Sequence, residues 1–430
     1  MAVFLGTLIV GNALIAPDKA VKARMLGQDF IAFYTGGTFV REGRRSLLYD
    51  LGAVRGFQHH LAGPLGIDLG DNFGPFWNPP FYAWVFAPLS ALSFPAALGV
   101  WTILSLSALA AALVLLARML PSRVGGSEEK PIGWREWGLV PALVLVSMPF
   151  LQAVSHGQNT FSSLLLLALT VTAWRGGHAL RAGLVAGLLF YKPQVGTVLA
   201  VVLALNLGWR ALVGIAVTGS ALLLVNLLTL PGTLGDYLHR LPENVHYMQV
   251  EHTYLWERHA TFKGFWRLLL QGRGPGEAAL AARTLTAACC AALGGGVLAA
   301  AWRWRRATGP RRDRLIAATV AAMPLLMPFY FDYDLLLLAV PAVLLAGEWL
   351  AGNPAEPRRP ADRWLIRAWV ALFAWLFVNS ALASRTRVNL TVALVTVIAG
   401  LLVRRAWRRE GEKSALPEMG APPLLARHAA

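Results

Sequence analysis

The sequence predicts an all-α integral membrane protein that crosses the bilayer many times. Of its 430 residues, 56% are hydrophobic and only 14% are charged, whereas a soluble domain carries about 25% charged residues. The apolar residues form a succession of runs, and a spanning helix needs roughly 17 to 25 such residues. Short clusters of arginine separate these runs, which is typical of the cytoplasmic loops of polytopic membrane proteins.

The apolar runs and their basic flanks predict about twelve spanning helices. The first run begins at Met1 without a basic leader, so we favour a first helix over a cleaved signal peptide. The proline-bounded run 79–94 is expected to lie on the outer membrane surface, because a span there would invert every later basic loop. The predicted spans are 1–16, 95–118, 137–153, 160–174, 182–191, 193–207, 210–230, 277–302, 315–328, 333–350, 364–383 and 389–403.

The basic clusters predict the orientation of these spans. The net charge is +16, from 39 Lys and Arg against 23 Asp and Glu. Because the basic residues lie in bursts between apolar runs, nucleic-acid binding is disfavoured and both termini are expected inside. The segments expected to face the cytoplasm are Arg118–Arg135, Arg175–Arg181, Arg210, Arg303–Arg314, Arg358–Arg367 and the tail from Arg404.

This topology gives one membrane domain, 1–403, followed by a cytoplasmic tail, 404–430. Two long segments, 17–94 and 231–276, face outward, and the first is expected to contain juxtamembrane helices. Outer loops of this length are usually functional or disordered. Since both are rich in aromatic residues and histidine, we expect the chemistry of the protein to lie there.

Asp29 is a candidate catalytic residue in the first outer segment. It follows the first predicted helix and precedes the aromatic stretch Phe30–Tyr34. An apolar setting at the membrane surface strengthens the affinity of a carboxylate for a proton and suits it to act as a general base. An N-cap for a helix that starts at Phe30 is an equally good interpretation.

Lys192 is the only basic residue between Arg181 and Arg210. It separates two short apolar runs, and Pro193 forces a break in the helix there. An ionisable residue in a membrane region is costly and is by default a functional candidate. We favour the binding of a lipid phosphate over a lysine that snorkels to the interface.

Two further groups of polar residues are expected on the outer side. In the turn His156–Thr160, Asn159 or Thr160 could cap the next helix, whereas His156 and Gln158 could contact a sugar or a phosphate. In the second outer segment, Arg258 could bind a phosphate as a planar fork, and His246 or His252 could assist proton transfer. Asp332 and Asp334 are interpreted as helix caps within an aromatic interfacial belt.

Neither a disulfide framework nor a cysteine-based metal site is expected, because Cys289 and Cys290 are adjacent and stand alone. The histidines and carboxylates of the second outer segment lack the helical spacing of a metal site. The sequence therefore predicts no metal and no cofactor.

Several short motifs occur in an order that resembles a known enzyme family. This order is similar to that of the PimE-like, polyprenol-phosphate-mannose-dependent α-(1→2)-mannosyltransferases, which have the GT-C glycosyltransferase fold. The resemblance runs from the first helix to about residue 345. The motifs are Gln28-Asp29-Phe30 with Tyr34, Leu48-Tyr49-Asp50, Phe76-Trp77-Asn78-Pro79-Pro80-Phe81, Ala87-Pro88-Leu89, Gly157-Gln158-Asn159, Tyr191-Lys192-Pro193 and Tyr333-Asp334-Leu335.

The resemblance implies a multi-pass enzyme of the bacterial inner (plasma) membrane that works at the extracytoplasmic face. It would move a hexose, with mannose favoured, from a polyprenyl phosphate to a hydroxyl of a cell-envelope glycolipid or glycan. Asp29 would be the general base of an inverting reaction, and Lys192 and Arg258 would bind the donor phosphate. The residues assigned to donor or acceptor contacts are His156, Gln158, Asn159, His246, His252, Tyr34 and Asn78.

Two other functions stay open at this stage. A polysaccharide polymerase or O-antigen ligase would also have about a dozen helices, and it would depend on Arg258 rather than on Asp29. A secondary transporter would have a similar number of spans. Transport is disfavoured because the two halves of the chain show no similarity and the polar candidates lie at the outer ends of the spans.

Overall fold

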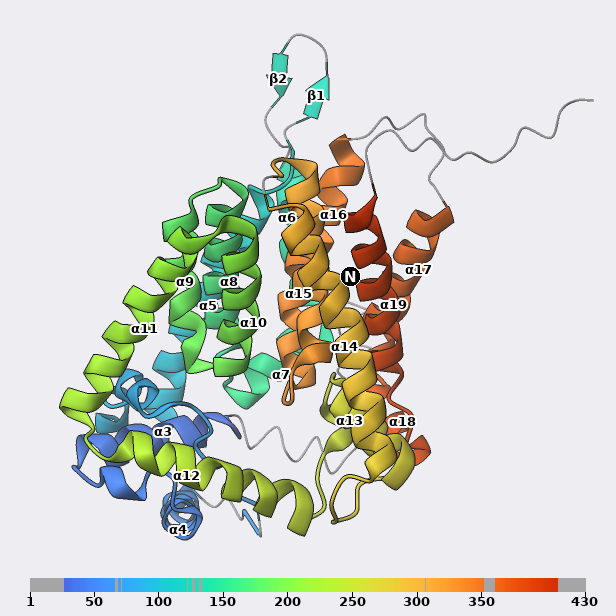
Figure 1. Ribbon diagram of the computed structural model, residues 1–430. Helices are drawn as coiled ribbons and strands as arrows, with labels where there is room; N and C mark the ends of the chain where they lie inside the picture. Colours follow the sequence, from blue (N-terminus) through green and yellow to red (C-terminus); the bar gives the residue numbers. More distant parts are fainter. Residues whose placement is uncertain are drawn as a thin grey trace, which may run out of the picture.

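The computed structural model describes residues 27–65, 69–70, 72–121, 123–125, 128–130, 134–305, 307–351 and 360–408. Within these residues the fold is an all-α bundle of the polytopic membrane type, as predicted (Figure 1). The predicted first span, 1–16, and the tail beyond Arg408 lie outside the described residues. The division into a membrane domain and a tail therefore stays a prediction.

The bundle consists of helices that coincide with the predicted apolar runs. A short hairpin of β1 (Arg123–Gly125) and β2 (Glu128–Lys130) extends from one end. The bundle helices are α5 (Phe94–Ala117), α6 (Trp134–Leu145), α7 (Met148–His156), α8 (Thr160–Arg175), α9 (Ala179–Leu188), α10 (Pro193–Leu207), α11 (Trp209–Thr229), α14 (Leu280–Arg303), α15 (Pro310–Leu326), α16 (Ala339–Ala351), α17 (Pro360–Trp375), α18 (Asn379–Thr386) and α19 (Leu390–Trp407).

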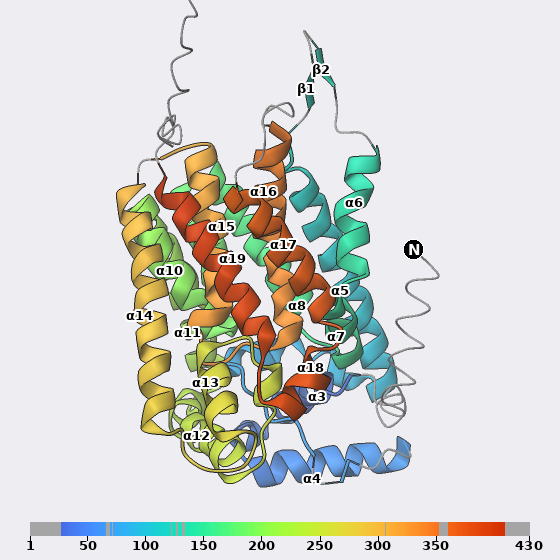
Figure 2. The ribbon, with the colours of Figure 1, turned by 90° about the vertical axis from the view of Figure 1, so that its right-hand side faces the viewer.

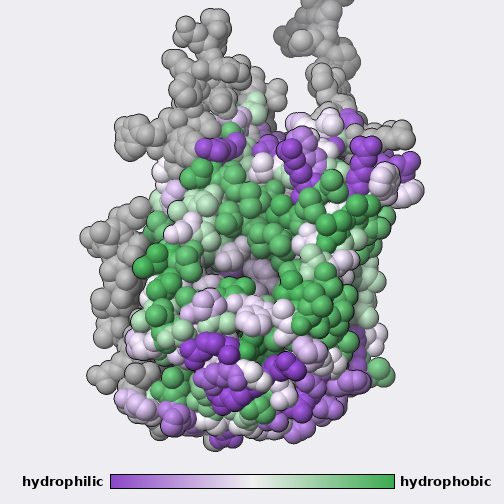
Figure 3. All heavy atoms as spheres, turned by 90° about the vertical axis from the view of Figure 1, so that its left-hand side faces the viewer, coloured by the Kyte–Doolittle hydropathy of each residue, from purple (hydrophilic) through white to green (hydrophobic). Residues whose placement is uncertain are grey.

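Fewer helices than predicted are long enough to cross a membrane alone. Among the described residues, five helices are long and apolar enough, or up to seven if each of two bent pairs counts as one span. The predicted spans 160–174, 182–191 and 193–207 are short apolar helices of 10–17 residues. The face in Figure 3 nevertheless carries a broad band of hydrophobic side chains between polar ends, as a bilayer requires.

Two predicted spans are bent rather than straight. The axes of α6 and α7 differ by 63°, and those of α17 and α18 by 86°. At the first bend, the Ser147 side chain accepts a hydrogen bond from the backbone N–H of Phe150, and Pro149 lies in the first turn of α7. A capping serine followed by proline starts a new helix, so the chain changes direction there.

The basic segments lie together at one end of the bundle. The described parts of all the predicted cytoplasmic segments lie at the end that carries the β1–β2 hairpin (Figures 1 and 2). The helices of the two predicted outer segments lie across the opposite end, which we call the loop end. They are α3 (Phe30–Arg41), α4 (Leu51–Ala62), α12 (Thr233–His246) and α13 (Phe262–Gln271).

The two outer segments bind each other directly. Asn244 of α12 donates a side-chain hydrogen bond to the carbonyl of Tyr49 at 3.0 Å, and Arg240 lies 3.2 Å from Asp50. The proline-bounded run forms two short 3₁₀ helices, η4 (Pro80–Val85) and η5 (Leu89–Ala91), and does not cross the bundle. Its place on the outer membrane surface stays a prediction.

Close packing of α9 on α11 orients the turn that carries Lys192. A Cβ atom added to Gly183 would lie 2.0 Å from the carbonyl oxygen of Ala211, and one added to Gly214 would lie 2.3 Å from that of Leu180. Only glycine permits this approach of two helix backbones, as in other membrane helix pairs. The 3₁₀ helix η6 (Leu189–Tyr191) then continues α9 toward the loop end.

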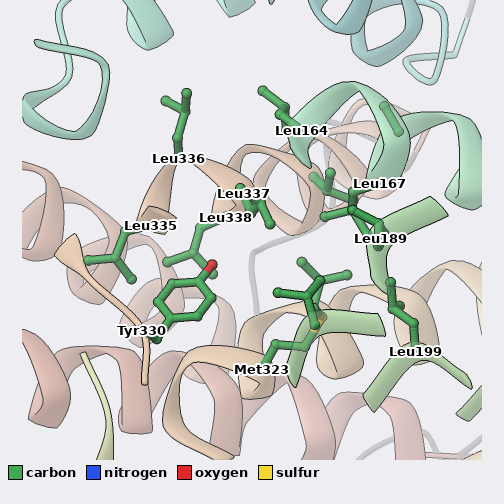
Figure 4. Close-up of a cluster of buried hydrophobic side chains, with 14 of the residues drawn as sticks. Leu164, Leu167, Leu189, Leu199, Met323, Tyr330, Leu335, Leu336, Leu337 and Leu338 are labelled. Carbon is green, nitrogen blue, oxygen red and sulfur yellow. The ribbon is translucent and has the colours of Figure 1, made fainter. Parts of the chain in front are cut away.

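The hydrophobic core lies directly behind the start of another short helix, η9 (Asp332–Leu338). Its leucines, Leu335–Leu338, are buried and are surrounded by side chains of α8, η6, α10 and α15 (Figure 4). A continuous buried leucine run anchors η9 firmly. Its first three residues are thereby held at the loop end, where the polar candidates gather.

Candidate active site

Asp29 lies immediately before α3, held against the end of α7. Its backbone N–H donates to the carbonyl of His156 at 3.0 Å. Asp29 has the N-cap position of α3, but its side chain makes no capping hydrogen bond. Its Oδ2 instead accepts a hydrogen bond from Gln158 Nε2 at 2.7 Å. The carboxylate is therefore oriented by a residue 129 positions away, and the capping interpretation is wrong for the side chain.

The turn after α7 brings Gln158 to Asp29. Gly157 has φ +65°, and a Cβ atom there would lie 2.7 Å from that of Phe30, so the turn requires glycine. Gln158 is buried, and its Nε2 donates both to Asp29 and to the Tyr333 hydroxyl, the latter at 3.0 Å. One amide thus joins the base candidate to the start of η9.

The same turn does not cap α8 through its side chains, contrary to one prediction. Asn159 occupies the N-cap position without a side-chain capping bond. Its Oδ1 is buried and has no hydrogen-bond partner among the described residues. Thr160 donates its hydroxyl to Asp334 at 2.7 Å. Both side chains therefore belong to the polar interior of the loop end.

Lys192 is buried and forms an ion pair with Asp334. Its Nζ donates to both carboxylate oxygens of Asp334, at 2.7 and 2.9 Å. The side chain of Lys192 is only 9% exposed, so the snorkelling interpretation is wrong. Asn78 holds the same turn by donating a hydrogen bond to the carbonyl of Tyr191 at 2.8 Å. Asn78 thus supports Lys192 from outside the polar network.

Arg258 lies in the 3₁₀ helix η8 (Trp256–Arg258) and makes a two-pronged ion pair with Asp332. Its Nε and one terminal nitrogen donate to the two oxygens of Asp332 at 3.1 and 2.9 Å. The other terminal nitrogen lies 3.2 Å from His156 Nε2. Burial lowers the pKa of Arg258, but the carboxylates of Asp332 and Asp29 outweigh burial and raise it above its usual value. Arg258 is a fixed cation.

The three residues that begin η9 contact three parts of the network, and this is the feature that sequence reasoning missed. Asp332 forms an ion pair with Arg258, and Asp334 forms one with Lys192. Between them, the Tyr333 hydroxyl accepts a hydrogen bond from Gln158. The belt-and-cap interpretation of the two aspartates is wrong for the Asp334 side chain, which pairs with Lys192 and Thr160. Both aspartates are ionisable residues next to an apolar run, and this feature could have marked them as functional candidates. The same reasoning was already applied to Lys192.

Asp29 and Lys192 therefore belong to one continuous polar network at the loop end. The path runs from Asp29 through Gln158 to Tyr333, and from the next residue, Asp334, to Lys192. Lys192 and Arg258 belong to the same network as one base candidate, and each has its own carboxylate partner.

An apolar cavity opens beside this network. It has a volume of about 460 Å³ and is lined by Phe190 and Pro193, which lie on either side of the Tyr191-Lys192 pair. Other walls come from η4, α11 and α12. Asn226 also lines it, and neither amide atom of this buried side chain has a partner among the described residues.

Three predicted contact residues lie away from the network. The Tyr34 hydroxyl donates to the carbonyl of Leu92 at 2.8 Å, within an aromatic cluster. His246 is half exposed and lies 3.5 Å from Glu277. His252 is exposed and contacts the carbonyl of Tyr247 at 2.9 Å. These residues make contacts within the outer segments and do not contact Asp29.

A layer of polar residues behind Arg258 fixes its backbone. Asn389 donates to the carbonyls of Glu257 and His259, both at 3.0 Å. Asn379 donates to the first of these at 3.2 Å. His259 is fully buried, and burial, with a smaller contribution from Lys263, lowers its pKa to about 3. This neutral histidine was not predicted from the sequence.

A metal site is not formed by the part of the chain that the structure describes. No group of three or more His, Cys, Asp or Glu side chains in these residues could hold a metal ion. Within the network, the cationic side chains are Lys192 and Arg258, each paired with a carboxylate.

Comparison with known proteins gives one match. A family model described as Glycosyltransferase family 87 matches residues 76–328, more than half of the chain. No curated protein and no solved structure matches significantly. The matched segment contains Asn78, the turn after α7, Lys192 and Arg258, whereas Asp29 and η9 lie outside it. The match supports the glycosyltransferase class and not the narrower α-(1→2)-mannosyltransferase assignment.

Proposed function

The chain belongs to glycosyltransferase family 87, and on this basis we propose that it transfers a hexose from a polyprenyl phosphate to a hydroxyl group. Mannose is the first candidate for the sugar. The acceptor is a glycolipid or glycan of the cell envelope. Membrane glycosyltransferase activity follows from the family, and the donor, the sugar and the mechanism are our proposal.

One observation carries the proposal. A carboxylate at the start of α3, the buried cation Lys192 and the partly buried cation Arg258 converge on the first turn of η9. Transfer from a sugar phosphate needs a base for the incoming hydroxyl and positive charge for the departing phosphate. Asp29 supplies the first requirement, and Lys192 and Arg258 supply the second.

The reaction follows from these roles. The acceptor oxygen forms a bond to the anomeric carbon while its proton passes to the Asp29 carboxylate. The bond between that carbon and the phosphate oxygen breaks, and its electron pair stays on the phosphate. Lys192 and Arg258 stabilise the charge that grows there. Attack from the opposite side inverts the anomeric centre, so a β-linked donor gives an α-glycoside.

The apolar cavity beside Lys192 suits the lipid part of the donor. Its walls are mostly apolar side chains of η4, α10, α11 and α12, and Pro193 follows Lys192 directly in the sequence. Phe190 and Pro193 line the cavity, and Lys192 lies between them in the sequence. A polyprenyl chain in this cavity would bring its phosphate to Lys192.

The proposed setting is the inner (plasma) membrane of a bacterium, with the site on the extracytoplasmic side. The basic segments lie at the opposite end of the bundle from the site (Figures 1 and 2). Basic loops are retained in the cytoplasm. A site at the loop end would then face outward, where cell-envelope acceptors are assembled.

The direct test is a donor panel. Purified protein in liposomes is incubated with polyprenyl phosphates that carry mannose, glucose, galactose or arabinose, and with a membrane glycolipid extract as acceptor. Consumption of one hexosyl donor supports the proposal, and mannose is the expected sugar. Use of the arabinosyl donor alone would overturn the hexose assignment, and transfer from an added nucleotide sugar with no use of any polyprenyl-phosphate donor would overturn the donor class.

The family match weighs further against the transporter alternative, because the family is described by glycosyl transfer. The polymerase alternative shares Arg258 with our proposal, since Arg258 belongs to the same network as Asp29. Loss of activity on substitution of Arg258 therefore does not separate the two. Only dependence on Asp29 does.

A further inference from the structure

Tyr333 has a hydroxyl proton that no described residue accepts. The phenol oxygen accepts a hydrogen bond from Gln158 Nε2 at 3.0 Å, and it donates none to the described part of the chain. The residue is only 6% exposed. A buried donor without a partner costs about 1–3 kcal/mol, so its position calls for a functional explanation.

The ring that carries this hydroxyl is held on several sides. It stacks on Phe331 with ring centres 5.4 Å apart and an interplanar angle of 20°. The Arg258 guanidinium lies 5.9 Å from the ring centre, and the His156 ring lies 6.0 Å away. The hydroxyl therefore has little freedom to turn toward another partner.

The hydroxyl also lies at the centre of the charged groups. Gln158 links it to Asp29, while the flanking residues Asp332 and Asp334 are the partners of Arg258 and Lys192. In the proposed reaction, the transferred sugar must lie between the base and the phosphate-binding cations. A sugar placed there would come within reach of the Tyr333 hydroxyl.

We propose that Tyr333 is a sugar-binding residue whose hydroxyl donates a hydrogen bond to one ring hydroxyl of the transferred hexose. This inference rests on the proposed function. Because Gln158 contacts both Tyr333 and Asp29, a correctly placed sugar also completes the hydrogen-bond chain that orients the base. Tyr333 thereby favours a sugar with a hydroxyl at the matching ring position.

Tyr333 would select a sugar because a hydroxyl with a hydrogen-bond partner is more stable than one without. A sugar that lacks the matching hydroxyl leaves the phenol proton unpaired, and sites built to bind a hydroxyl discriminate strongly against analogues without it. Tyr333→Phe removes the donor and keeps the ring, its stacking on Phe331 and its position under Arg258. The variant is therefore expected to fold.

The test combines this substitution with deoxy donors. The polyprenyl-phosphate hexose that the wild-type enzyme consumes is compared with its monodeoxy forms, each lacking one ring hydroxyl. We measure kcat/KM for wild type, Tyr333→Phe and Tyr330→Phe. The last is a matched control, because it removes another buried phenol hydroxyl, one that donates to the carbonyl of Asp334 at 2.7 Å.

The expected result is specific to one ring position. In the wild type and in Tyr330→Phe, one deoxy donor is used about ten-fold less well than the parent hexose. In Tyr333→Phe, the loss of kcat/KM for that deoxy donor relative to the parent hexose disappears. Any loss of kcat/KM for the other deoxy donors stays as in the wild type. If Tyr333→Phe keeps every penalty of the wild type, Tyr333 does not bind the sugar and the inference is overturned. If the wild type uses no polyprenyl-phosphate sugar, the proposed function fails instead.

Discussion

Lys192 and Asp334 lie 142 positions apart in the sequence and form a buried ion pair in which both carboxylate oxygens lie within 2.9 Å of Nζ. A buried pair of this kind adds little stability over an apolar pair, although loss of one partner is strongly destabilising. Its presence at the site is better explained by function. The pair keeps a cation in the turn next to the cavity-lining Pro193 without leaving it uncompensated in the resting enzyme.

This pair predicts different effects of single and double substitutions. Lys192→Ala leaves the Asp334 carboxylate buried without its cation, so we expect lower stability and donor use reduced at least about ten-fold. Lys192→Met combined with Asp334→Leu removes both charges and should recover much of the stability without recovering activity. Thermal unfolding in detergent and donor kinetics measure the two effects. Full activity in the uncharged double variant would contradict a role in phosphate binding.

Lys192→Arg provides a second check on the same residue. The compact ammonium of Lys192 donates to both oxygens of the Asp334 carboxylate, and one of these oxygens also accepts from the Thr160 hydroxyl. A planar guanidinium is larger and directs its donors differently. We expect this charge-conserving variant to stay well below wild-type donor use, and recovery to the wild-type level would show that charge alone suffices.

Asp29→Asn is predicted to abolish transfer while the protein stays folded. The amide keeps the shape of the carboxylate and can still bond to Gln158, but it cannot accept the proton of the acceptor hydroxyl. Asp236→Asn is the matched control, because Asp236 lies on α12 in the second outer segment, outside the network. Transfer is measured in liposomes with radiolabelled donor. Wild-type activity in the Asp29→Asn variant would remove the base assignment and would favour the polymerase alternative.

Filling the apolar cavity is predicted to weaken the use of long-chain donors. An added Cβ at Gly219 meets no atom within 4 Å, and Gly219 lines the cavity, so Gly219→Phe introduces a ring without a clash at its base. We expect KM for a long polyprenyl donor to rise about ten-fold, equal to ~1.4 kcal/mol. A short-chain donor should be affected much less.

The control for this prediction is Gly295→Phe on α14. Gly295 is also free of neighbours within 4 Å of an added Cβ, and it lies outside the residues that line the cavity. The control should leave KM for both donors near the wild-type value. Equal effects of the two substitutions would show that the cavity does not hold the lipid chain.

His259 is predicted to make the folded protein sensitive to acid. Burial lowers its pKa from an ordinary 6.5 to about 3, so the unfolded chain takes up a proton at a higher pH than the folded one. The stability that His259 contributes is fully present above pH 6.5 and is lost as the pH falls from there toward 3. Between pH 6.5 and 4.5 the loss amounts to about 2 to 3 kcal/mol at most.

The measurement compares wild type with His259→Gln, which stays neutral at every pH and can still bond to the Tyr254 hydroxyl, 3.0 Å from Nε2 of the native side chain. Melting temperatures are recorded in detergent at several pH values. The wild type should lose more stability on acidification than the variant. Parallel decreases in both proteins would assign the acid sensitivity to other groups.

Much of the fold was predictable because its signals are local. Apolar runs, prolines and basic flanks indicated the positions of helices such as α5 and α14 almost to their ends. The bends at Ser147 and after α17 were not predicted. Hydropathy reports how apolar a segment is, but a change of direction depends on how the flanking helices pack.

The candidate site was predictable only as separate residues. Asp29 was indicated by its apolar setting, Lys192 by the cost of a charge in a membrane and Arg258 by the fork geometry of its guanidinium. Tyr34 was indicated by the family resemblance, and His246 and His252 by residue type in an outer segment, yet the structure places all three away from the network. Residue type and approximate depth do not reveal the direction in which a side chain points.

The sequence by itself determined that this chain is a helical membrane protein with its polar candidates at one end, because hydrophobicity and helix formation depend on neighbours along the chain. Only the tertiary structure decided that Asp332, Tyr333 and Asp334 join Arg258, Gln158 and Lys192. Those partners lie 74 to 175 positions away. Contacts over such separations exist only after helices have packed, and their geometry is set by close approaches such as that of α9 to α11.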